Sequence, residues 1–138
     1  MEKNENILKL EHALMEGILR SPHRIPQTLL EQWKSSTVIK IELTGAGFFV
    51  NYHVPSNVPT LTDNQNFTVG NIGAKIPGLK SGAGFVLFVR NGVISMLEGY
   101  SYDESWPDTV ESFELFEIDG KEIDWDNVTE TASNGDRG

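Results

Sequence analysis

The sequence predicts an α+β fold in which two N-terminal helices pack on an antiparallel β-meander of five or six strands. Apolar residues recur at helical spacing near the N-terminus, and from about residue 38 the period changes from 3.6 to 2. Thirteen glycines and six prolines favour many turns and argue against a helical bundle. A chain of 138 residues has the size of one domain. We place that domain at residues 1–120 and an acidic, partly disordered tail at 121–138.

Two helices are expected at the N-terminal end. The first, over residues 5–20, has an apolar stripe along one side, and Glu11 and Glu16 lie off that stripe. It ends at Ser21-Pro22, because the residue before a proline is pushed out of the helical region. A shorter helix over residues 26–34 begins with a proline, which suits a first helical turn. The stripe of the first helix consists of Ile7, Leu10, Leu14 and Ile18, broadened by Leu8, Met15 and Leu19.

Three strands are expected next. Residues 38–44 alternate apolar and polar side chains, which is typical of a half-buried strand. Gly45-Ala46-Gly47 forms a turn, and residues 48–54 return as a second strand rich in aromatic and β-branched residues. A polar loop over residues 55–66 leads to a weaker strand over residues 67–76. Two glycines inside that third strand indicate a bulge or a close backbone approach.

A β-hairpin is the clearest local prediction. Residues 85–90 and 93–99 flank Asn91-Gly92, the pair that a type I′ turn prefers because both of its central positions need positive φ. Both faces of the hairpin are largely apolar, so we expect these strands to be central in the sheet and partly covered on each side. The predicted facing pairs are Val89 with Ile94, Leu87 with Met96, Phe88 with Ser95, and Val86 with Leu97.

A last strand is predicted over residues 111–119, and its apolar pattern changes phase midway. Phe113 and Leu115 share one face, whereas Phe116 and Ile118 share the other. A bulge would allow all four side chains to reach a core. Beyond this strand the chain becomes a polar tail that three apolar residues would anchor partway: Ile123, Trp125 and Val128.

Negative charge is concentrated at the C-terminal end of the chain. The net charge is −9, and residues 98–138 hold thirteen acids against two bases. Nucleic-acid binding needs clustered Lys and Arg, and anionic membrane surfaces attract basic segments. We therefore expect neither a nucleic acid nor a membrane as the ligand. A focused negative field favours a basic protein surface instead.

The usual residue patterns of metal sites and catalytic sites are missing. There is no cysteine, and His12, His23 and His53 lack the spacing of a zinc motif. Both Gly-Ala-Gly turns lead into strands rather than helices, so neither forms a phosphate cradle. We expect no metal, no cofactor and no enzymatic activity, although a converging pair of carboxylates stays open as an alternative. The charged N-terminal segment, with no long apolar run after it, indicates a cytoplasmic location.

One segment combines aromatic and acidic residues directly after a strong strand. Residues 97–108 read Leu-Glu-Gly-Tyr-Ser-Tyr-Asp-Glu-Ser-Trp-Pro-Asp. Tyr and Trp supply large, stiff contact areas at binding hot spots, and carboxylates would meet Lys and Arg of a partner. The other interpretation is a loop whose aromatics fold back onto the core, Trp106 above all. The candidate partner-binding residues are Glu98, Tyr100, Tyr102, Asp103, Glu104, Trp106 and Asp108.

The same stretch resembles small bacterial proteins, some of which look like immunity proteins of polymorphic or contact-dependent toxin systems. The resemblance covers roughly residues 44–118 and is strongest over 82–107. There, Gly-Ala-Gly-Phe, an apolar strand, Asn-Gly, a second apolar strand and the acidic aromatic segment follow one another. Such proteins share no catalytic motif, so no site residue is carried over. The resemblance implies a cytoplasmic, non-catalytic protein that binds and neutralises one cognate toxin with a basic surface.

Two other functions stay open from the sequence. A small enzyme or ligand-binding domain would have a pocket between helices and sheet that gathers Tyr52, His53 or a pair of carboxylates. A homodimer would bury the aromatic side chains of residues 100–106 against a second copy of the chain.

Overall fold

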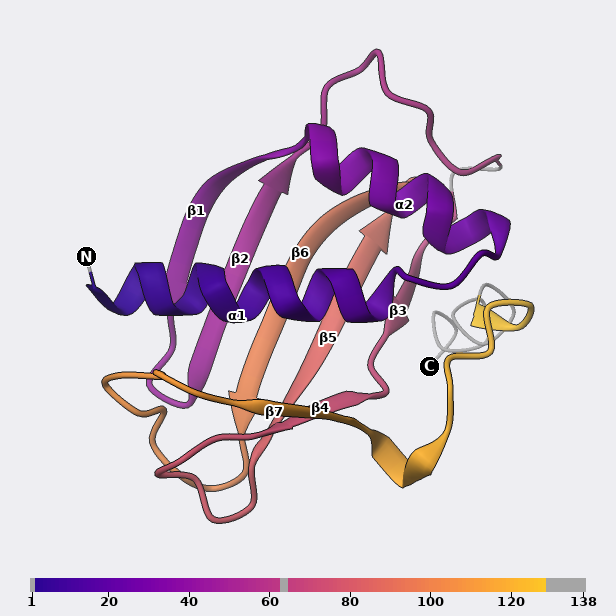
Figure 1. Ribbon diagram of the computed structural model, residues 1–138. Coiled ribbons are helices and arrows are strands. Elements are labelled where there is room, and N and C mark those ends of the chain that lie inside the picture. Colours follow the sequence, from indigo (N-terminus) through magenta and orange to yellow (C-terminus); the bar gives the residue numbers. More distant parts are fainter. Residues whose placement is uncertain (1, 63–64, 129–138) are drawn as a thin grey trace.

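The chain folds into two α-helices and one antiparallel sheet, over the residues that the structure describes (Figure 1). The structure is a computed structural model, and it describes residues 2–62 and 65–128. The α+β class and the N-terminal helices are confirmed, but the sheet has seven strands instead of five or six. The elements are α1 (Glu2–Ile18), α2 (Arg24–Ser35), β1 (Thr37–Leu43), β2 (Gly47–His53), β3 (Phe67–Val69), β4 (Ile72–Lys75), β5 (Ala83–Arg90), β6 (Val93–Ser101) and β7 (Glu114–Glu117).

The sheet has the strand order β1-β2-β6-β5-β4-β7, and β3 also pairs with β5. The predicted third strand is therefore two strands, β3 and β4, which pair with β5 one after the other. The break lies at Gly70, where a Cβ would be 3.2 Å from the carbonyl oxygen of Phe85. The glycine lets the chain pass close to β5 before it turns away to meet β7.

The Asn91-Gly92 hairpin forms as predicted between β5 and β6. Asn91 has a φ of 54° and Gly92 a φ of 75°, as a type I′ turn requires. Val89 faces Ile94, but the register then shifts by one residue between Phe88 and Val89. The other predicted pairs were wrong, because this β-bulge changes which residues meet. The observed pairs are Phe88 with Met96, Leu87 with Leu97, and Val86 with Glu98.

Both described helices lie on the same face of the sheet (Figure 1). The side chains that the strands point toward them are fully buried, and Phe48, Phe85, Leu87 and Leu97 form the centre of the core. The alternate residues of the same strands point to the opposite face, which no described helix covers. The hairpin strands are central in the sheet, as expected, and their side chains on this second face are half-buried. We call the two sides the covered face and the open face.

Helix α1 buries the predicted apolar stripe, and it also buries one residue, Glu11, that was predicted to lie off the stripe. Ile7, Leu14 and Ile18 are buried as expected, but Glu11 is buried with them and is only 1% exposed. Glu11 was wrongly assigned to the exposed side of the helix. It follows Ile7 by four residues and precedes Met15 by four, so it lies on the inner edge of the stripe.

The C-terminal part of the described chain returns to the core. Strand β7 covers only four residues, and Phe116 points to the open face, so the predicted bulge that would bury it was wrong. Beyond β7, Trp125 is buried and Ile123 and Val128 pack against the core, as the sequence predicted. The rest of the predicted tail, residues 129–138, lies outside the described residues. Neither α1 nor α2 is long and apolar enough to cross a membrane.

Candidate functional site

The open face of the sheet carries a continuous set of apolar and aromatic side chains. In the register of the strands, Phe49 faces Glu98, and Glu98 in turn faces Val86. These three residues therefore share the open face, because alternate residues of a strand point to opposite sides. We call the whole set the open-face platform. It consists of Phe49, Val86, Phe88, Met96, Tyr100, Tyr102 and Phe116, with the carboxylate of Glu98 among them.

Two glycines let aromatic rings of the platform lie against the strands. A Cβ at Gly84 would be 2.6 Å from the ring of Tyr100 and 2.7 Å from the hydroxyl of Tyr102. On the next strand, a Cβ at Gly73 would be 2.7 Å from the ring of Phe116. Gly73 and Gly84 face each other across β4 and β5, so their missing side chains leave one shared space. The three rings occupy that space, and they form a broad aromatic surface.

Tyr100 and Tyr102 form a pair at the edge of this surface. Their ring centroids are 5.4 Å apart at an interplanar angle of 82°, an edge-to-face arrangement. Burial raises the pKa of the Tyr100 hydroxyl above its ordinary value, and hydrogen bonding with Tyr102 and the negative charge of Glu98 act in the same direction. These effects stabilise the neutral phenol of Tyr100. Tyr102 is 43% exposed, so its ring is available for contact.

The open face carries charges of both signs, Glu42, Glu98 and Glu114 against Lys40, Lys75 and Arg90. Glu98 lies between Phe49 and Val86 and forms no salt bridge with any residue in the described part of the chain. Glu42 on β1 accepts a hydrogen bond from the side chain of Asn51, at 3.1 Å. Glu42 also has Lys40 at 4.0 Å, and Lys75 faces Glu114 at the other side of the sheet. The Arg90 guanidinium is 5.3 Å from the Phe88 ring centroid. A half-buried carboxylate among apolar side chains favours a partner that supplies Lys or Arg.

The structure separates the seven predicted partner-binding residues into three groups. Glu98, Tyr100 and Tyr102 lie together on the open-face platform. Asp103 and Asp108 are exposed beyond the end of β6, and Asp103 has a φ of 58°. The remaining two, Glu104 and Trp106, are held in contacts within the chain.

Trp106 folds back onto the core, as the alternative interpretation of its loop expected. Its side chain is 6% exposed, and its ring centroid is 5.3 Å from that of Phe48 in an edge-to-face contact. Its backbone N–H donates to the carbonyl of Gly45 at 2.8 Å. Trp106 therefore closes one end of the core, and its inclusion among surface contact residues was wrong.

Glu104 stabilises a neighbouring turn with its carboxylate. Its Oε2 accepts hydrogen bonds from the backbone N–H of Lys80 at 2.9 Å and of Ser81 at 3.3 Å. Because both donors precede β5, this carboxylate fixes the entry to the strand that carries Gly84. Glu104 therefore supports the platform indirectly, because it holds the backbone of Lys80 and Ser81 just before β5.

A buried carboxylate under α1 is the polar group that the sequence did not predict. Glu11 Oε2 accepts hydrogen bonds from the Tyr52 hydroxyl at 2.6 Å and from Trp33 Nε1 at 2.7 Å. Its Oε1 is buried with no hydrogen-bond partner among the described residues, and His12 Nε2 lies 3.9 Å away. Burial raises the pKa of Tyr52 far above its usual range, and the charge of Glu11 and the hydrogen bond to it add to the shift. Tyr52 is thus a hydrogen-bond donor here and not a base.

Tyr52 and His53, which the sequence-based alternative offered for a pocket, do not share one. Tyr52 lines a cleft with Glu11, His12 and Trp33 between the helices and the sheet. Tyr52 points into the core beside Glu11, whereas His53 is exposed and faces Thr37 at the end of β2. Successive residues of a strand point to opposite faces, so the two side chains cannot meet in one cavity. In the described residues, no group of three His, Cys, Asp or Glu side chains could hold a metal ion.

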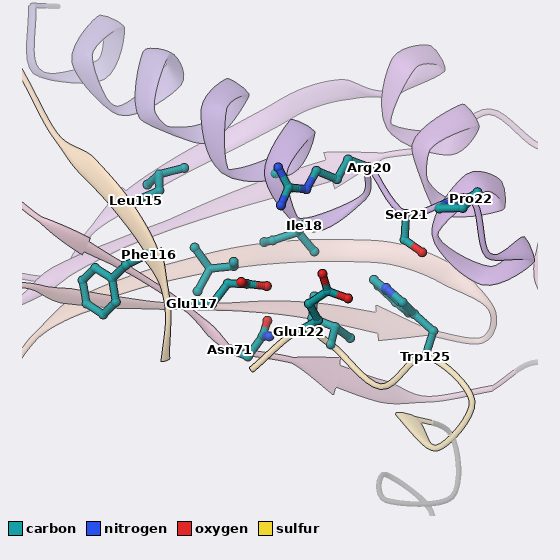
Figure 2. Close-up of a pocket in the computed structure, with 13 residues that line it drawn as sticks. Ile18, Arg20, Ser21, Pro22, Asn71, Leu115, Phe116, Glu117, Glu122 and Trp125 are labelled. Atoms are coloured by element: carbon teal, nitrogen blue, oxygen red, sulfur yellow. The ribbon is translucent and has the colours of Figure 1, made fainter. Parts of the chain in front are cut away.

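A cleft does open between the end of α1 and the sheet (Figure 2). Its volume is about 530 Å³, and Arg20 lines it on the α1 side, with Glu117 and Glu122 on the opposite side. On its floor, the side-chain N–H of Asn71 donates to the Lys121 carbonyl at 2.8 Å. The amide oxygen of the same side chain, Asn71 Oδ1, is buried without a hydrogen-bond partner among the described residues. The cleft thus offers one guanidinium, two carboxylates and one free amide oxygen.

Comparison with known proteins gives no relative for this chain. No family model, no curated protein and no solved structure matches it. The resemblance to immunity proteins therefore stays a prediction that rests on the sequence pattern of residues 82–107.

Proposed function

We propose that this chain is a non-catalytic binding protein that docks a basic protein domain on its open-face platform. The observation that supports this proposal best is the aromatic surface of Tyr100, Tyr102 and Phe116, on a face that no described helix covers. Glu98 lies next to it along β6 and forms no salt bridge with the described residues. Aromatic residues are enriched at binding hot spots. The chain keeps these apolar side chains half exposed although the opposite face of the same strands is fully covered.

The carboxylate of Glu98 selects the partner. A carboxylate that becomes buried on binding needs a direct cationic partner, because an unpaired buried charge costs several kcal/mol, on the order of 3–5. Arg or Lys of the docked domain would supply that pair at Glu98. The exposed Asp103 and the net charge of −9 would steer a basic surface toward the platform during the encounter.

The resemblance to immunity proteins gives this partner a biological class. A cognate toxin with a basic active cleft would be neutralised when the platform covers that cleft. Carboxylates would then occupy the positions that phosphates of a nucleic-acid substrate take. We therefore propose toxin neutralisation as the purpose of the docking.

One observation favours a second candidate function, a small-molecule site in the cleft of Figure 2. The buried Oδ1 of Asn71 is an acceptor without a donor among the described residues, and Arg20 stands across the cleft. A ligand with an N–H or O–H group and an anionic group would satisfy both. An Asn71→Ala variant that still binds the protein partner fully, and a metabolite that raises the melting temperature of the wild type only, would favour this function.

The docking proposal is tested by differential capture from the source lysate. The baits are the wild type, Glu98→Lys and, as a control with the same change in charge, Glu16→Lys on the exposed side of α1. We expect a protein with a basic domain to be captured by the wild type and by Glu16→Lys. Its affinity for Glu98→Lys should fall by about 100-fold or more, because a buried pair becomes a repulsion. If every captured protein binds both variants equally well, the platform is not the docking site.

A further inference from the structure

Strand β1 forms one edge of the sheet and is unusually exposed for its apolar content. It pairs only with β2, so the backbone groups along its other side have no partner strand among the described residues. Ile39 is 66% exposed, and Val38 and Leu43 are also exposed. The opposite edge strand, β7, has four residues, whereas β1 has seven. Long apolar edges invite pairing with another strand, and proteins normally shorten or charge them.

The sequence of β1 is complementary to itself in the antiparallel direction. If two copies pair about a two-fold axis at Ile41, Lys40 of one copy faces Glu42 of the other, on both sides of the axis. In the same register Ile39 faces Leu43, and Ile41 faces its own copy. Opposite charges and branched apolar side chains are the favourable cross-strand pairs. A symmetric dimer interface needs this kind of self-complementary surface.

The geometry of β1 is compatible with this pairing. Residues 40–43 are in regular register with β2, so the centre of the pair lies on regular strand. The register shift is between Val38 and Lys40, so Ile39 is a bulged residue without a partner on β2, and it lies just outside the regular segment. Lys40 Nζ and Glu42 Oε2 are 4.0 Å apart in the single chain, and both side chains are largely in solvent. They can therefore exchange this weak contact for pairs across the axis.

We propose that the chain forms a homodimer in which the β1 strands of two copies pair antiparallel and join the two sheets into one. The pairing covers the exposed apolar edge and satisfies its free backbone groups. Because the two-fold axis is perpendicular to the joined sheet, both open-face platforms lie on the same side. The dimer would present two docking surfaces to its partners. This proposal concerns β1 and does not depend on what binds the platform.

The charge pair gives a decisive test by light scattering after size exclusion, over a range of concentrations. Lys40→Glu places Glu opposite Glu, and Glu42→Lys places Lys opposite Lys. Each single variant should dissociate at about tenfold higher concentration than the wild type, or more. The double variant K40E/E42K restores opposite charges and should regain the wild-type dimer. An equimolar mixture of the two single variants should form heterodimers, because every facing pair in that mixture is complementary.

Three controls keep the outcomes separate. The melting temperature of each variant shows that the monomer is folded, which is expected because both side chains are exposed. Ile39→Lys should also give a folded monomer, since it removes an apolar contact without touching the covered face. Glu98→Lys should leave the dimer unchanged, so loss of docking and loss of dimer are distinguishable. A wild type that stays monomeric at all concentrations, or a double variant no more dimeric than the single ones, would overturn the proposal.

Discussion

The two faces of the sheet are built from the same strands but differ in what covers them. Phe48, Phe85 and Leu97 on the covered face are fully buried under the helices. Their immediate neighbours on the open face, Phe49 and Val86, are also apolar but half exposed. Full burial of such a side chain contributes about 1.5–3 kcal/mol, and partial burial contributes less. Burial on the covered face therefore contributes most of the stability, whereas binding explains the apolar residues of the open face better.

The largest expected effect comes from Trp106, which belongs to the covered side although it lies in the acidic aromatic segment. Trp106→Ala removes the contact with Phe48 and leaves a cavity, so we expect a loss of about 3–5 kcal/mol in the free energy of unfolding. Tyr102→Ala is the matched change on the open face, four residues away along the chain. It should cost about 1 kcal/mol or less, because Tyr102 is 43% exposed. Urea denaturation of both variants measures the difference.

An equal or larger loss of stability for Tyr102→Ala would contradict this difference between the two faces. If Tyr102→Ala destabilised the chain as much as Trp106→Ala, the open face would be a second structural core and not a docking surface. Binding assays complete the test, since Tyr102→Ala should weaken partner capture while the fold remains intact.

The sequence predicted the elements better than it predicted which side chains lie inside. The Asn91-Gly92 turn was predictable because its signal is local and needs only positive φ at two residues. The bulge in the same hairpin was not, because nothing in the sequence near Phe88 distinguishes the two registers. The predicted platform residues Glu98, Tyr100 and Tyr102 do lie together, since they follow one strand. The remaining platform residues come from other strands, and their meeting depends on strand order.

A buried polar residue on α2, Gln32, was also not predicted from the sequence. Gln32 is fully buried on α2, where its amide donates to the carbonyl of Gly92 at 2.9 Å and accepts from the N–H of Ile94 at 2.9 Å. It fixes the helix to the turn of the hairpin. Its partners are about sixty residues away in the chain, so no local pattern indicates them. Glu11 was more accessible to prediction, because its spacing to Ile7 and Met15 already placed it on the buried stripe.

Glu11 gives the next prediction, of intermediate size. Glu11→Ala removes the acceptor for both Tyr52 and Trp33 and leaves two donors buried, so we expect a loss of about 2–4 kcal/mol. Glu11→Gln keeps an acceptor oxygen and places an N–H₂ group near the position of the unpartnered Oε1, so its cost should be roughly 1 kcal/mol. Thermal and urea unfolding of the two variants measure this ranking.

The exposed acid Glu16 lies on the same helix and provides the control for Glu11. Glu16→Ala should change the free energy of unfolding by about 0.5 kcal/mol or less, because its side chain is in solvent. Equal effects of the alanine changes at positions 11 and 16 would mean that the buried network does not stabilise the covered face.

The smallest expected effect is a change in the free energy of unfolding with pH, which arises from Tyr52 on the covered face. Tyr52 on the covered face has a pKa raised far above the ordinary value of 10.0, chiefly by burial. Below about pH 10 the hydroxyl is protonated in both the folded and the unfolded chain, so its contribution to stability is constant. Above that pH the unfolded chain loses the proton while the folded chain retains it. Stability then falls by up to about 1.4 kcal/mol per pH unit as pH rises.

Tyr52→Phe removes this titration together with one hydrogen bond to Glu11. We therefore expect the variant to be about 1 kcal/mol less stable than the wild type at pH 8, with the gap narrowing as pH rises above 10. Urea unfolding of the wild type and of Tyr52→Phe at several pH values from 8 to 11 measures this gap, on the scale set by the ordinary tyrosine pKa. A gap for Tyr52→Phe that stays constant through pH 11 would mean that water reaches this hydroxyl in the folded chain, and the covered face would then be less closed than its packing indicates.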